Sequence, residues 1–84
     1  MYLNLIKSYI NIIKKEDIKI FLNNNNIYLN DKELDYAYYI VKNKYELIIN
    51  NDNDIFYEIK NNISKVNYEK LLILYNKYIK LINL

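Results

Sequence analysis

The stretch Leu-Asn-Asp-Lys-Glu-Leu, residues 29–34, carries the clearest local signal in the sequence. With Asn30 as a helix N-cap, Glu33 falls at the third helical position, where its side chain can accept from the Asn30 backbone N–H. Leu29 and Leu34 flank this capping box at the spacing of a hydrophobic staple. The stretch therefore predicts the start of a helix. Its inward residues are expected to be Leu34, Ala37, Tyr38, Val41 and Tyr45.

Two further helices are predicted before this stretch. In residues 2–13, apolar side chains recur every three or four positions, as on one face of a helix. Glu16 and Asp17 then place negative charge in the first turn of a second helix, where the helix dipole favours it. Its inward face would carry Ile18, Phe21 and Leu22. The asparagines at 23–26 predict a helix stop rather than a linker, because Asn tolerates the left-handed conformation that ends helices.

Residues 45–49, read as YELII, alternate apolar and polar positions for a short distance. This pattern is typical of extended chain. Pairing with a strand at residues 27–29 is one interpretation, but two short strands do not form a stable sheet. We therefore interpret residues 45–49 as a connector and leave its conformation open.

The segment NNDNDIFYE, residues 50–58, spaces its carboxylate and amide oxygens as a calcium loop would. That template fails at its sixth position, which holds Ile55 instead of Gly, and at its twelfth, which holds Asn61 instead of Glu. A helix start explains the segment better, with Asn51 as N-cap and negative charge in the first turn. The charged residues of that turn are Asp52 and Asp54.

A last helix is predicted from about Lys65 to Ile82. Ser64 precedes it as N-cap, with Ile63 and Tyr68 in staple positions. Its inward face would carry Tyr68, Leu71, Leu72, Tyr75, Ile79 and Ile82. Because it is the longest predicted element, we expect it either to form the centre of the core or to present the face that another chain covers.

Together these elements predict an all-α protein: one small domain over residues 1–84, with four to five short helices and a longer C-terminal helix. A chain of this length buries only about 60 to 65% of its unfolded surface, so we expect little stability without a partner. The apolar run at residues 36–41 is far below the ~18 to 20 residues of a membrane span. A secretory signal is not expected either, which favours a cytoplasmic protein.

The composition excludes several kinds of site. The sequence has no Cys, His, Gly, Pro, Trp, Arg, Gln or Thr. It therefore offers neither a zinc site of thiolates and imidazoles nor a nucleophile paired with histidine, and no glycine-rich loop for phosphate. The carboxylates are expected to cap helices or, as at Glu58 and Glu69, to lie exposed. We predict no catalytic residue, no metal, no cofactor and no small-molecule substrate, so an enzyme is not expected.

Seven residues are predicted to contact a partner: Tyr36, Tyr39, Lys65, Lys70, Lys77, Tyr78 and Lys80. The three tyrosines lie off the inward faces of their helices, and aromatic residues are enriched at interfaces. The four lysines give the last helix a basic side that could meet phosphates. Against that reading, the net charge is only +2, and the chain has no Arg for bidentate phosphate recognition.

The preferred functional hypothesis is a non-catalytic interaction module that docks on a protein partner or on a second copy of itself. The alternative is a small accessory factor on RNA, for example on a ribosome, that uses the basic last helix and Tyr78. The two hypotheses differ in their expected salt dependence, since phosphate binding weakens steeply as salt rises.

The order of helices and turns resembles a YqfT-like family of small helical bacterial proteins, over about residues 17–81. The segments that carry the resemblance are DIKIFL (17–22), NIYLNDKEL (26–34), YELIINNDNDIF (45–56) and IS (63–64). The resemblance implies a helical fold. Since the family has no assigned activity, it implies no site.

Overall fold

The computed structural model describes residues 2–82, with side chains described for residues 5–80. Over these residues the chain forms five helices and no strand: α1 (Tyr2–Ile12), α2 (Lys15–Asn24), α3 (Asp31–Ile49), α4 (Asn53–Asn62) and α5 (Lys65–Ile82). The predicted all-α fold is confirmed. No helix in the described part of the chain is long and apolar enough to cross a membrane.

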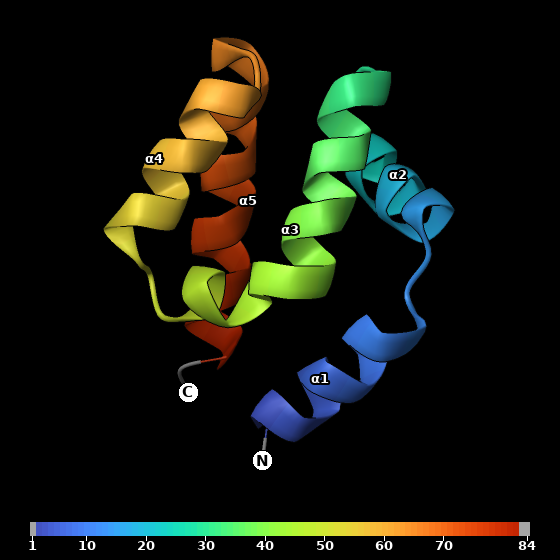
Figure 1. The fold of residues 1–84 in the computed structure, drawn as a ribbon, viewed down its shortest axis with the longest axis vertical. Helices are drawn as coiled ribbons and strands as arrows, with labels where there is room; N and C mark the ends of the chain where they lie inside the picture. Colours follow the sequence, from blue (N-terminus) through green and yellow to red (C-terminus); the bar gives the residue numbers. More distant parts are fainter. Residues whose placement is uncertain (1, 83–84) are drawn as a thin grey trace.

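Helix α3 is the central element of the fold (Figure 1). It packs against α1 and α2 on one side and against α4 on the other, while α5 lies beside α4, its closest neighbour. The last helix is long, as predicted, but it is not the longest element. α3 is one residue longer, at 19 residues against 18 for α5. Of the two places expected for the last helix, the centre of the core is wrong, because the buried core cluster contains no described residue of α5, and the face that another chain covers stays a prediction.

The predicted start of α3 is confirmed in detail. The Glu33 backbone N–H donates to Asn30 Oδ1 at 2.8 Å, and the Asn30 N–H donates to Glu33 Oε1 at 3.0 Å. Leu34 is buried in the main core cluster and Leu29 packs against that cluster, as a hydrophobic staple requires. The start of α5 is confirmed as well, because the Asn67 N–H donates to Ser64 Oγ at 3.3 Å.

Asparagine ends both α2 and α3 in the same way. Asn26 and Asn51 adopt the left-handed conformation, with φ of 63° and 58°. In each case the next residue closes the helix end: the Ile27 N–H donates to Leu22 O at 2.9 Å, and the Asp52 N–H donates to Leu47 O at 3.0 Å. This is the Schellman pattern. The prediction that the asparagine tract at 23–26 stops a helix is confirmed.

The predicted cap of α4 is wrong by one residue. Asn51 belongs to the end of α3, so Asp52 becomes the N-cap, and its Oδ1 accepts from the Ile55 N–H at 3.0 Å. The connector proposed at residues 45–49 is also wrong, because these residues continue α3. The backbone of Lys44 is non-helical, with φ of −135° and ψ of 20°, and the helix bends there (Figure 1).

The main core lies in the N-terminal half of the fold. Its five buried members are Ile13, Ile18, Leu22, Ile27 and Leu34. Ile27 is the most buried, at 1% exposure, although it lies in the connection between α2 and α3. Phe21, which was predicted to point inward with Ile18 and Leu22, is 45% exposed, and its ring instead lies 5.9 Å from that of Tyr78 on α5.

Helix α5 is packed much more loosely than the core. Its predicted inward residues Leu71, Leu72 and Tyr75 are only half-buried, and no side chain described between residues 65 and 80 is fully buried. The apolar face of α5 therefore points towards the other helices without being enclosed by them.

Candidate functional site

An apolar pocket lies along the inward face of α5. Its volume is about 330 Å³, and its walls come from α2, α3, α4 and α5. Six of the residues that line it are Tyr36, Ile40, Phe56, Ile59, Leu72 and Tyr75. The lining side chains are all aliphatic or aromatic. Seven of the fifteen lining residues, on α2, α3 and α5, were predicted from the sequence to face inward: Phe21, Ala37, Val41, Tyr68, Leu71, Leu72 and Tyr75. The spacing along single helices could not show that the helices leave space between them.

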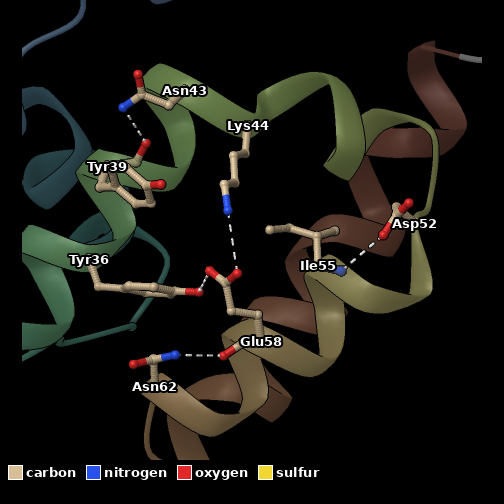
Figure 2. A network of polar contacts seen from close by, with 8 residues as sticks. All are labelled: Tyr36, Tyr39, Asn43, Lys44, Asp52, Ile55, Glu58 and Asn62. Carbon is tan, nitrogen blue, oxygen red and sulfur yellow. Dashed lines mark hydrogen bonds and ion pairs between the residues drawn. The ribbon is translucent and has the colours of Figure 1, made fainter.

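A polar network adjoins this pocket between α3 and α4 (Figure 2). The Tyr36 hydroxyl donates to Glu58 Oε2 at 2.5 Å, and Lys44 Nζ lies 3.4 Å from Glu58 Oε1. The Tyr36 ring also lines the pocket. Glu58 was expected to be exposed, but it is half-buried, with Tyr36 and Lys44 of α3 in contact with its carboxylate.

The network changes the ionisation of its members. Burial raises the pKa of Tyr36, and the hydrogen bond to Glu58 raises it further, so the phenol stays protonated well above its usual range. The same hydrogen bond, together with the Lys44 ammonium, holds the pKa of Glu58 below its ordinary value. Glu58 is therefore ionised, and Tyr36 is a donor already bound to it.

A second network joins the N-terminal ends of α3 and α5. Glu33, which is only 6% exposed, accepts from the Ser64 N–H at 2.6 Å and from Asn67 Nδ2 at 3.2 Å. Asn67 Nδ2 also donates to Tyr28 O at 3.1 Å. Burial by itself would raise the pKa of Glu33, but the donors from Ser64, Asn30 and Asn67 outweigh it and hold the pKa below its usual value. The capping box identified Glu33, but no local pattern could show that it also bonds to α5.

The three predicted contact tyrosines lie in different surroundings. Tyr36 is bound to Glu58, as described above. Tyr39 is 47% exposed, with Lys44 Nζ 5.6 Å from its ring centre. Tyr78 is 38% exposed and packs against Phe21. The fold brings Tyr36 and Tyr39 together, with ring centres 6.5 Å apart, and places Tyr78 on another helix.

The four predicted contact lysines are all exposed on α5. Lys70, Lys77 and Lys80 share one face of the helix with Val66 and Ile73, since these positions recur at three and four residues. Lys70 Nζ donates to Asn26 O at 3.2 Å, and Lys77 Nζ lies 5.7 Å from the Tyr78 ring centre. This outward face of α5 is thus basic, with two aliphatic side chains between its lysines.

The acidic segment at residues 50–58 forms no cluster of metal ligands. Asp52 caps α4, and no group of three or more His, Cys, Asp or Glu side chains suited to a metal ion occurs among the described residues. The interpretation of this segment as a helix start agrees with its structure.

Comparisons with known proteins found no match: no family model, no curated protein and no solved structure matches the chain. The resemblance to the YqfT-like family therefore stays a prediction, and any function has to be inferred from the residues themselves.

Proposed function

We propose that this chain is a non-catalytic interaction module that docks on a protein partner or on a second copy of itself. The outward face of α1 carries the proposal. Leu5, Tyr9 and Ile12 share that face at the spacing i, i+4, i+7, and they are 65%, 57% and 71% exposed. An exposed apolar patch of this kind is typical of a protein interaction site.

The opposite side of α1 already packs against the rest of the fold. Ile10 and the following Ile13 are buried against the rest of the fold, and Lys42 Nζ on α3 holds the end of the helix by donating to Ile10 O at 2.8 Å and to Asn11 O at 3.2 Å. A helix that is apolar on both sides gains stability when its second side is covered. The small core of this chain makes that gain significant.

Sedimentation velocity over a range of concentrations tests docking on a second copy, with the double substitution Leu5→Lys and Ile12→Lys as the disrupting variant. A matched control is Tyr57→Ser, which changes a side chain that is 69% exposed on α4. We expect the parent and the control to associate and the double variant to stay monomeric.

Docking on another protein is tested with a candidate captured from the native source and then purified. It should bind the parent and the Tyr57→Ser control directly and lose at least about tenfold in affinity for the double variant, as expected when a central apolar contact is removed. A chain that stays monomeric and has no partner sensitive to Leu5 and Ile12 would contradict the proposal.

A small accessory factor on RNA is the second candidate, and the outward face of α5 favours it. Lys70, Lys77 and Lys80 are exposed there, Lys65 is exposed at the start of the helix, and Glu69 is the only acid in the sequence of α5. Their contribution would be electrostatic and independent of sequence. Tyr78 adds little to base stacking in this arrangement, because its ring packs against Phe21.

Substituting Lys70, Lys77 and Lys80 together by Glu separates the two candidates. RNA binding measured by fluorescence anisotropy should disappear in this variant, and in the parent it should weaken steeply between low and physiological salt. Unaltered RNA binding by the triple variant would eliminate the second candidate.

A further inference from the structure

We propose that the pocket between α3, α4 and α5 binds a small molecule with a straight, uncharged aliphatic chain. This site lies on the inward side of α5, away from the outward faces of α1 and α5 discussed above. It is therefore a function in addition to partner docking and does not depend on it.

The shape of the pocket suits an elongated small molecule. Its lining along α5 runs from Tyr68 to Tyr78, and ten residues of helix at 1.5 Å each span about 15 Å. The pocket is therefore elongated along α5, with a volume of about 330 Å³. The volume itself falls in the range of small-molecule sites.

The chemistry of the walls favours an uncharged ligand. The walls carry no ionic group that could compensate a buried charge. Two of the phenols in the lining have already donated their only hydroxyl proton, Tyr36 to Glu58 and Tyr75 to Ile48 O at 2.9 Å. The interior of the pocket therefore favours a ligand that makes apolar contacts.

The loose packing of α5 explains why a ligand in the pocket would stabilise the fold. Leu71, Leu72 and Leu74 all line the pocket, and each is only half-buried. A ligand in the pocket would cover these side chains and the facing residues of α3 and α4 at once. Binding should therefore tighten the contact of α5 with the rest of the fold, in proportion to the apolar area covered.

Octanol is a suitable probe, because it has an uncharged straight chain and dissolves at useful concentrations, and octanoate is its charged counterpart. We expect octanol to bind with a Kd below about 1 mM. In methyl-detected NMR of the native chain, intermolecular contacts should involve Ile40, Ile59 and Leu72. At neutral pH octanoate should bind at least about tenfold more weakly, because its carboxylate would lose solvation at an apolar wall.

Two neighbouring substitutions on α5 provide a matched test. Leu72→Trp fills the pocket, whereas Ile73→Trp places the same ring on the outward face, where Ile73 is 71% exposed. Octanol binding should weaken at least tenfold in the first variant and stay unchanged in the second. The proposal is overturned if octanol shows no contacts with the pocket methyl groups of the native chain, if octanoate binds as tightly as octanol, or if folded Leu72→Trp binds like the parent.

Discussion

The two halves of this small fold follow the same local rules but differ in how well they bury their apolar residues. In the first half, α2 and the start of α3 enclose a cluster in which Ile27 is 1% exposed and Leu34 is 8% exposed. In the second half, α4 also buries an apolar side chain, with Ile55 at 3% exposure. α5 is capped just as correctly, yet it has no fully buried side chain among residues 65–80. Good local signals thus form helices, but they do not guarantee that the helices close on one another.

One of the two largest effects is expected at Glu33, which joins the two halves. Glu33→Gln replaces an acceptor with an amide and sets donors against the N–H groups of Ser64 and Asn30. We expect a loss of about 2 to 4 kcal/mol in the free energy of unfolding, the cost of breaking a buried charged network. Urea unfolding measures it, with Glu69→Gln on the exposed face of α5 as the control. An unchanged stability in Glu33→Gln would mean that the halves are not joined there.

The difference between the halves can be measured with one substitution made in each. Leu34→Ala removes a buried side chain from the core and should cost about 2 to 4 kcal/mol, whereas Leu72→Ala enlarges a space that is already open and should cost less than about 1.5 kcal/mol. Thermal or urea unfolding of both variants measures the two losses in stability. Equal losses would show that α5 is packed as tightly as the core.

The stability should also depend on pH through Glu33. Its pKa is lowered in the fold, so its contribution is fully present above its unfolded pKa of about 4.3 and is lost as the pH falls through the folded value. Urea unfolding between neutral pH and acid should therefore show a steeper decline for the parent than for Glu33→Gln. If the free energy of unfolding declined equally with pH in the parent and in Glu33→Gln, Glu33 would not be ionised and hydrogen-bonded in the fold.

A smaller effect is expected at Tyr36, beside the pocket. Tyr36→Phe removes one hydrogen bond to Glu58 and should cost about 0.5 to 1.5 kcal/mol. Because the pKa of Tyr36 is raised in the fold, its contribution is present below the unfolded pKa of about 10 and declines as the pH rises further. The parent should therefore lose stability in alkali more steeply than Tyr36→Phe. Tyr57→Phe, at an exposed position, is the control and should match the parent.

The smallest effects are expected where asparagine ends a helix. Asn26→Gly should leave the stability unchanged or raise it by up to about 1 kcal/mol, because Gly adopts positive φ freely, while Asn26→Ala should lower it by about 1 kcal/mol. The same pair at Asn51 should behave alike, since both positions close a helix by the same pattern. An Ala variant more stable than the Gly variant at either position would contradict the left-handed conformation there.

The sequence predicted best the features that are formed by residues close to one another in the chain. The capping box at Asn30 and Glu33 and the stop at residues 23–26 follow from side chains and backbone groups within one turn of each other, so their physics is visible in the sequence. The errors at Asn51 and at residues 45–49 are linked, because α3 continues through residues 45–49 and Asn51 then closes it.

The sequence could not predict contacts between residues that lie far apart in the chain. The bonds from Glu33 to Ser64 and from Tyr36 to Glu58 join residues 31 and 22 positions apart, and no periodic pattern records such pairs. The pocket is a property of the space between four helices. Spacing along each helix predicts which side chains point inward, but not whether they meet.

Native-state hydrogen exchange compares the two halves most directly. If α5 is loosely packed around the pocket, the backbone amides of residues 71–75 should exchange at least about tenfold faster than those of residues 37–41 in the middle of α3, and octanol should slow them towards the same rate. Equal protection of the two segments in the free chain, unaffected by octanol, would contradict the account.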